Sequence, residues 1–358
     1  RTGIPELRDM PQDISIYNGF GRHSMAGAHK LVPILSLCLL AAAVRSPASV
    51  SLLISEPMGR FGFFNPTGHA SIYLSGVCAE TPTVLRLCRA GETGVVVSRY
   101  NRIGGRDWIA VPLLPYLYAV EGHDEVPAVA SPDVVTRLRD EYRRAQLREF
   151  APDGAPGEAV RGDWIQMVGA AYHRTIYGFT LETTAEDDQR LVDYLNSQPN
   201  RRRFHLLFRN CADFAGSIIN FYYPRAVRRG LIADAGILTP KQSAKALVAY
   251  SRRRPEIKFT RFVIPQVPGI RPSAKVRGVS ESLVRSKKYL APALYFEPWV
   301  AAAAGAAYLI SGRFNPRGQP HVVCEPGSLP ACAASGGGDF GLPEAFPAEW
   351  HPPEEDVL

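Results

Sequence analysis

Residues 69–75, HASIYLS, decide the fold class of this chain. Apolar side chains at every second position are typical of a β-strand. The stretch SVSLLIS (49–55) has a similar character. Three more short apolar runs follow with turn residues between them: TVLRLC (83–88), GVVVSRY (94–100) and DWIAVPL (107–113). Strands so close together in sequence predict an antiparallel sheet.

Helical patterns come after these strands. The segment 131–150, SPDVVTRLRDEYRRAQLREF, has a capping serine and a proline at the first helical position. DWIQMVGAAYH (163–173) and TAEDDQRLVDYLNSQ (184–198) also have helical spacing, and FHLLF (204–208) predicts a short strand. A sheet followed by helices, and then by a strand and a helix, predicts an α+β fold with an antiparallel sheet packed against helices.

The stretch RNCADFAGSI (209–218) places a cysteine at the start of a helix. Asn210 is a favoured N-cap residue, and Asp213 can close a capping box with it. Cys211 then lies in the first turn. There the helix dipole and free N–H groups lower the pKa of a thiol, and the same N–H groups can hold an oxyanion.

A histidine that could activate this thiol stands at the first position of the strand 69–75. His69 shares one strand face with residues 71 and 73, and we expect the cysteine helix to pack against the sheet. A thiol and an imidazole placed in this way suit nucleophilic catalysis. The alternative is a cysteine that only packs, since cysteine is among the most buried residue types and the chain has eight histidines.

Together, GHASIYLS (68–75) and RNCADFAGSI (209–218) resemble the circularly permuted papain-like superfamily, which includes lecithin retinol acyltransferase-type and NlpC-type envelope enzymes. The likeness is greatest to the bacterial envelope branch that contains lipoprotein N-acyltransferases. The resemblance implies that Cys211 is the nucleophile and His69 the base. The family's third, imidazole-orienting residue is usually polar and on the next strand. Here 83–88 offers no His, Asn or Gln, and Ser98 on the following strand is the candidate. A two-residue site, a missed insertion and an inactive relative are the alternatives.

The resemblance also implies a reaction, acyl transfer through a Cys211 thioester. The basic segment 201–288 and the hydrophobic stretch 289–312 favour a lipid or a lipoprotein as the acyl donor. One alternative is a peptidoglycan or peptide amide hydrolase, that is, a cysteine peptidase. Another is a non-catalytic, membrane-anchored binding or assembly protein on the same fold. No cofactor is expected, and no set of His, Cys and acidic residues has metal-ligand spacing, so no metal site is predicted either.

Charge is spread unevenly over the 358 residues. Between Arg201 and Lys288 there are twenty Lys and Arg against four Asp and Glu, a net of +16, so that the remainder of this +7 chain carries −9. Such asymmetry predicts an anionic partner. Zinc-finger spacing, RNA-binding aromatic motifs and basic heptads are missing from the sequence, which favours a membrane, an anionic lipid or a cell-wall surface over nucleic acid. A solvated basic face is the alternative.

The N-terminal region has the layout of a secretory signal. Met25 opens a short basic start, an apolar run follows from Leu31 to Val44, and small residues precede residue 49. We therefore interpret 25–48 as a signal sequence and 1–24 as a non-native upstream segment. The signal predicts an extracytoplasmic location, in the periplasm or cell envelope.

The remaining boundaries follow from composition. We expect a papain-like catalytic domain over 49–270, a basic linker over 271–288 and a hydrophobic stretch over 289–312. That stretch is long enough to span a membrane, but Glu297 and Pro298 interrupt it, so a helix docked on the protein or lying on a membrane surface is the alternative. The Pro- and Gly-rich tail 313–358 predicts disorder.

Cys78 and Cys88 flank the run AETPTVLRL near the facing ends of two expected strands. A disulfide between them is compatible with an exported protein. The alternative is two independent cysteines that point to opposite faces.

Overall fold

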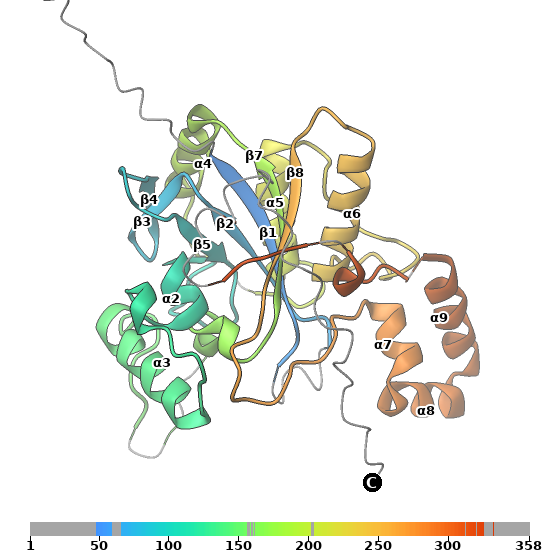
Figure 1. Cartoon of the computed structure of the whole chain (residues 1–358). Helices are drawn as coiled ribbons and strands as arrows, with labels where there is room; N and C mark the ends of the chain where they lie inside the picture. The colour runs from blue at the N-terminus through green and yellow to red at the C-terminus, as the bar shows by residue number, and fades with distance from the viewer. Residues whose placement is uncertain are drawn as a thin grey trace, which may run out of the picture. The chain divides into compact units, whose positions relative to one another are not determined.

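The computed structural model describes residues 48–58, 66–155, 158, 160, 162–201, 204–311, 313–319, 321–325 and 332. Its main feature is a seven-stranded sheet in the order β6-β5-β2-β1-β7-β8-β9 (Figure 1). Every neighbouring pair is antiparallel except β8 and β9. The strands are β1 (Ser49–Ser55), β2 (His69–Leu74), β5 (Val95–Ser98), β6 (Ile109–Pro112), β7 (Ile176–Glu182), β8 (Phe259–Ile264) and β9 (Val322–Val323).

The sheet is buried on both faces, and β1 lies at its centre with every residue buried. One face packs in a cluster that includes Leu53 and Tyr73, together with α2 (Leu113–Tyr118) and α3 (Pro132–Gln146). The other face carries Leu52 and Ile72 and packs against α4 (Ala185–Ser197), α5 (Cys211–Tyr222) and α6 (Pro240–Arg252). The predicted α+β class, with an antiparallel sheet packed against helices, is confirmed at this level.

The expected strands 49–55, 69–75, 94–100 and 107–113 correspond to four strands of this sheet. The run 83–88 belongs elsewhere: β4 (Val84–Leu87) pairs with β3 (Val77–Thr81) in a separate two-stranded sheet. As a result, β5 is the direct partner of β2. No sequence pattern described above predicts β7 and β8, which extend the sheet on the far side of β1.

Two local predictions are wrong. Residues 163–173 form two short 3₁₀ turns instead of a helix, and Gly169 between them has φ +64°, which an α-helix cannot accommodate. Residues 204–208 form a turn closed by a bridge between His205 and Arg209, and most of their side chains are exposed, which does not suit a strand of a buried sheet.

The region after residue 270 is more ordered than its composition predicts. The expected linker contains α7 (Val279–Arg285), and the expected tail contains β9 and the disulfide Cys324–Cys332. The stretch 289–312 forms two helices, α8 (Lys287–Phe296) and α9 (Pro298–Ser311). The chain is interrupted between them because proline is tolerated at the first position of a helix, as at Pro298, but disrupts a helix interior. Within the described ranges, no helix has both the length and the apolar character needed to cross a bilayer.

The predictions for 1–24 and for 25–47 fall outside the described residues, as does most of the tail beyond 325.

Candidate active site

The start of α5 is built as its sequence predicts. Asn210 accepts a hydrogen bond from the backbone N–H of Asp213 (2.9 Å), and the Asp213 carboxylate accepts one from the N–H of Asn210 (3.1 Å). This capping box places Cys211 at the first helical position, where it is the free cysteine of the described residues. The helix therefore presents the thiol and its first N–H groups in one place.

The Asn210 amide also fixes two loops around the thiol. Its Nδ2 donates to the carbonyl of Leu206 (2.9 Å) and to that of Leu238 (3.0 Å). The Asn210 side chain thus holds the start of α5 and the two loops together by hydrogen bonds. Because the three hydrogen bonds of its side chain are all made to backbone groups, Asn210 is a positioning residue for the site.

His69 begins β2, and its ring is oriented by Ser98 on the neighbouring β5. Ser98 Oγ lies 2.9 Å from His69 Nε2 and donates to the carbonyl of Ala70 at 2.8 Å. A hydroxyl has one proton, and a carbonyl can only accept. Ser98 must therefore accept a hydrogen bond from Nε2–H, which leaves Nδ1 of the neutral imidazole unprotonated and able to act as a base.

Two further side chains shape the environment of this imidazole. Tyr100 lies opposite His69 and stacks on it with ring centroids 5.1 Å apart. Burial, reinforced by the positive charge of Arg174, holds the pKa of His69 well below its usual value. Arg174 itself is buried, and its guanidinium donates to the side chain and carbonyl of Gln166. The base is therefore neutral and held in one orientation.

The thiol is also neutral at rest. Burial raises the pKa of Cys211 to about 11, against the opposing effect of the backbone N–H groups of Ala70, Ala212 and Cys211 itself. Those N–H groups place the sulfur beside Ala70, the residue that follows His69. The low thiol pKa expected from the helix start is wrong for this resting state, because desolvation outweighs the helix N-terminus.

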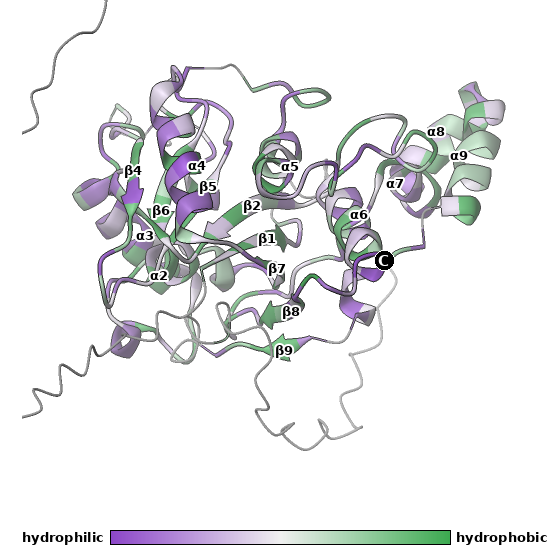
Figure 2. Ribbon diagram, turned by 90° about the horizontal axis from the view of Figure 1, so that it is seen from above, coloured by the Kyte–Doolittle hydropathy of each residue, from purple (hydrophilic) through white to green (hydrophobic). Residues whose placement is uncertain are grey.

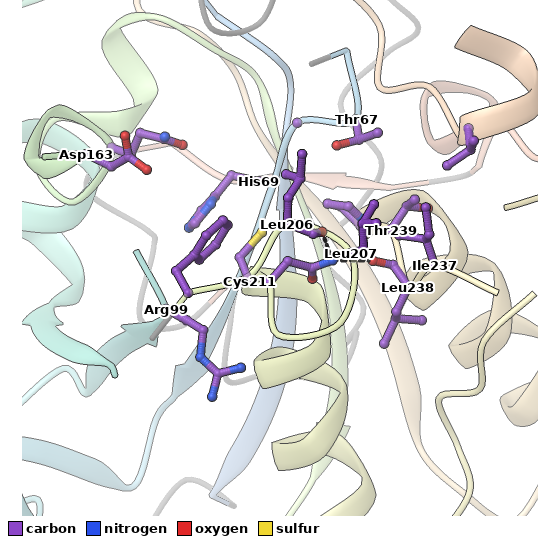
Figure 3. A pocket seen from close by; sticks show the side chains of 16 residues that line it. Thr67, His69, Arg99, Asp163, Leu206, Leu207, Cys211, Ile237, Leu238 and Thr239 are labelled. Atoms are coloured by element: carbon purple, nitrogen blue, oxygen red, sulfur yellow. Dashed lines mark hydrogen bonds between the residues drawn. The ribbon is translucent and has the colours of Figure 1, made fainter. Parts of the chain in front are cut away.

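Cys211 and His69 border the same cavity, which has a volume of about 180 Å³. In the view of Figure 3, Asp163 lies to one side of Cys211, and Ile237 and Leu238 lie to the other. The cavity therefore has a polar end at Asp163 and an opposite end that is mainly apolar, although it also holds Thr67 and Thr239 (Figure 3). Its apolar walls are Phe204, Leu206, Leu207, Ile237, Leu238, Pro240 and Val279.

The two groups reach this cavity from different faces of the sheet. Helix α5 packs on the face that carries Ala70 and Ile72, whereas His69 shares its face with Ser71, whose Oγ lies 3.0 Å from the hydroxyl of Tyr116. Thiol and imidazole thus approach each other around the first residues of β2, and not across the sheet face that α5 covers. A polar side chain at the very end of a strand can contact groups on either face of the sheet.

Sequence reasoning identified Cys211, His69 and Ser98, and the structure brings all three to this end of the sheet. It missed Tyr100, although a period of two places Tyr100 on the same face as Ser98. It also missed Gln166, which lies in the stretch 163–173 that was expected to be a helix, and Arg174, which lies in the irregular segment that follows it.

The described cysteines other than Cys211 form disulfides. Cys78 and Cys88 are joined with a Cα separation of 4.9 Å, as the sequence allows, and the bond Cys324–Cys332 was not anticipated. Among the described residues, the side chains grouped closely enough to suggest a metal site are Cys78, Cys88 and Glu92, but the two sulfurs are already bonded to each other.

Comparison of the chain with protein-family models, curated proteins and solved structures finds no match.

Proposed function

We propose that this chain is a thiol-dependent acyl-transfer enzyme with a permuted papain-like core, in which Cys211 is the nucleophile and His69 the base. The observation that carries the proposal is the hydrogen-bond chain through Ser98. It leaves Nδ1 of His69 unprotonated at a cavity that Cys211 also borders. A neutral imidazole in this state can take the proton of a neutral thiol as the sulfur attacks.

The reaction would run in two halves. Nδ1 of His69 takes the Cys211 proton, the sulfur attacks the carbonyl carbon of an ester or amide, and the N–H groups of Cys211 and Ala212 hold the oxyanion. The carbonyl–oxygen or carbonyl–nitrogen bond then breaks, and His69 returns the proton to the leaving group. An amine or water, deprotonated by His69, attacks the thioester, and the carbon–sulfur bond breaks to restore the thiol.

The apolar end of the cavity favours a lipid or lipoprotein as the acyl donor. Leu206, Leu207, Ile237 and Leu238 offer hydrocarbon surface to an acyl chain next to the thiol. An ester whose chain lies along these walls would present its carbonyl to Cys211.

The polar end supports a second candidate, a peptide or peptidoglycan amide hydrolase. Asp163 and Gln166 border the cavity and could bind the amide groups of a peptide. The same fold without catalysis, as a binding or assembly protein, is the third possibility, and a thiol with a raised pKa is compatible with it.

Two disulfides support an extracytoplasmic location, because such bonds persist in oxidising compartments. They add to the signal-like pattern of residues 25–48.

A fluorescent thiol-reactive acyl probe tests the proposal. Labelling should disappear in Cys211→Ala and in His69→Ala, and should survive in His123→Ala, a control at an exposed histidine. Retained labelling in His69→Ala would mean that the thiol of Cys211 is merely accessible, and would favour a non-catalytic binding or assembly protein. Among active forms, transfer from a phospholipid ester to an amine supports the acyltransferase, whereas release of a free amine from a peptide supports the hydrolase.

A further inference from the structure

The helical pair α8–α9 exposes an unusual amount of apolar surface. Figure 2 shows it as a largely hydrophobic pair beside α7, and in both ribbon views it extends beyond the sheet. At the turn between the two helices the side chains of Tyr295, Phe296 and Trp299 are 81%, 73% and 69% exposed. Leu294, Leu309 and Ile310 are exposed as well. Such a patch on a folded chain marks a surface for a partner.

Positive charge flanks both chain ends of the same pair. Arg285 and Lys287 stand exposed where α8 begins, and Arg313 stands exposed just after α9 ends. Beside Ile310, an open groove of about 540 Å³ between α6 and α9 is lined by further basic side chains, Arg252 and Arg253. The pair therefore has an aromatic tip at its turn (Tyr295, Phe296 and Trp299) and basic feet where it begins and where it ends (Arg285, Lys287 and Arg313).

One acidic residue lies at the tip. Glu297 accepts a hydrogen bond from the indole N–H of Trp299 (2.6 Å). A carboxylate is costly in hydrocarbon and is tolerated at the depth of lipid headgroups. On a lipid surface, Glu297 would therefore suit the headgroup level and not the bilayer centre.

We propose that α8–α9 docks on the surface of a membrane that contains anionic lipids, with its aromatic side chains at headgroup level and its basic feet against lipid phosphates. Helices of 10 and 14 residues are too short to span the roughly 30 Å hydrocarbon core. Amphipathic aromatic rings favour the membrane interface, and Lys and Arg near it are attracted to anionic lipid. This combination of tip and feet complements a lipid surface.

Docking would bring the candidate active site close to the membrane. Helix α7 leads directly into α8, and Val279 at its start borders the cavity of Cys211. The inference concerns binding and goes beyond the proposed chemistry. Accordingly, Cys211→Ala should bind vesicles as the wild type does, so that failure of docking and failure of catalysis are separate results.

The test needs a local signal, because the apolar run 31–44 of the full chain would also hold it on a vesicle. Trp299 supplies one among the four tryptophans of the sequence. Vesicles of phosphatidylcholine and phosphatidylglycerol with brominated acyl chains should quench the fluorescence of the wild type, and the quenching should be largely lost in Trp299→Phe. Equal quenching of the two chains would overturn the proposal.

Charge variants test the feet. Lys287→Glu and Arg313→Glu should each lower the apparent affinity for the anionic vesicles by about fivefold, as measured by the quenching of Trp299. Arg148→Glu, a matched exposed charge reversal on the loop after α3, should leave it unchanged. If all three variants behave alike, the feet do not bind lipid and the proposal fails.

A second copy of the chain is the competing occupant. Replacing Tyr295, Phe296 and Trp299 with serine should leave the melting temperature unchanged, because these side chains are exposed, and should leave the oligomeric state in solution unchanged as well. If the serine variant instead dissociates a wild-type dimer, the patch is a subunit interface and membrane docking is wrong.

Discussion

Ser98 Oγ lies 2.9 Å from His69 Nε2, across the one strand pairing that joins β2 to β5. Replacing Ser98 with alanine removes the acceptor for Nε2–H, so that the ring loses its preferred tautomer and orientation. We expect Ser98→Ala to slow acyl-probe labelling of Cys211 by about tenfold or more. Ser51→Ala, which removes a buried hydroxyl paired with Thr180 elsewhere in the sheet, should leave the rate unchanged. Full labelling in Ser98→Ala would remove Ser98 from the site.

The pH dependence of the site follows from two pKa shifts. The pKa of His69 is lowered, so the base stays neutral, and acyl-probe labelling should persist, down to a pH below 6.5. The pKa of Cys211 is raised to about 11, so its reaction with iodoacetamide, which needs the thiolate, should keep rising with pH through the alkaline range. If the rate of the iodoacetamide reaction is instead independent of pH from acid to neutral pH, the site holds a preformed thiolate–imidazolium pair, and this neutral resting state is wrong.

Asp188 on α4 should make the fold less stable at neutral pH. Burial raises its pKa to about 6, and the hydroxyl of Tyr222 donates to its Oδ1 at 2.7 Å. A carboxyl with a raised folded-state pKa costs stability when it is ionised. The cost is therefore present above pH 6 and disappears as the pH falls toward the unfolded-state value of about 3.8.

We accordingly expect Asp188→Asn to raise the free energy of unfolding at pH 7 by about 1–3 kcal/mol and to have less benefit at pH 4. Thermal melts at the two pH values measure this. Asp193→Asn, on the same helix with its carboxylate accepting from Gln189, is the control. A destabilised Asp188→Asn at pH 7 would mean that the charged form is the favoured one.

The buried carboxylate of Glu56 depends on Arg317, from the segment after α9. Arg317 donates to both Glu56 oxygens at 2.7 and 2.9 Å, and Ser273 donates to one of them at 2.6 Å. Arg317→Met should cost about 2–3 kcal/mol, toward the low side for a buried pair because the arginine is 40% exposed. Adding Glu56→Gln should restore part of this loss in a double-mutant cycle. Additive losses would show that the pair is not coupled.

The disulfides predict a simple thiol pattern. Without reductant, alkylation of the unfolded protein should modify Cys211 and spare Cys78, Cys88, Cys324 and Cys332. Replacing Cys78 and Cys88 together with serine should lower the free energy of unfolding by about 2–3 kcal/mol, because the loop they close is short. Alkylation of Cys78 and Cys88 in protein from its native compartment would remove one support for extracytoplasmic placement.

The first half of the fold could be predicted from sequence, since β1 and β2 alternate or run apolar over their whole length. In the second half, the helix α4 and the start of α5 could be predicted, but the strands β7 and β8 could not. Strand β7 contains Gly178, which weakens the strand pattern, and the structure shows its purpose: a Cβ at Gly178 would lie 2.1 Å from the ring of Phe262 on β8. A glycine that makes room for a ring on the neighbouring strand can be interpreted only once the strands are paired.

The candidate site divides in the same way. Capping chemistry is local, so the position of Cys211 at a helix start follows from Asn210 and Asp213. The stacking of Tyr100 on His69 and the approach of the Arg174 charge depend on strand register and on a chain reversal far away in sequence. Such contacts leave no periodic signal.

Strand β9 has a consequence for proteolysis. It pairs with Phe262 and Val263 of β8, and the backbone of Cys324 continues this pairing to the carbonyl of Val263. A single protease cut just after α9, followed by loss of the released peptide, would expose the backbone of β8 at the edge of the sheet. The same cut would remove Arg317, the partner of the buried Glu56. Unpaired strand edges recruit other chains. The clipped product should therefore aggregate, even though the cavity beside Cys211 is untouched.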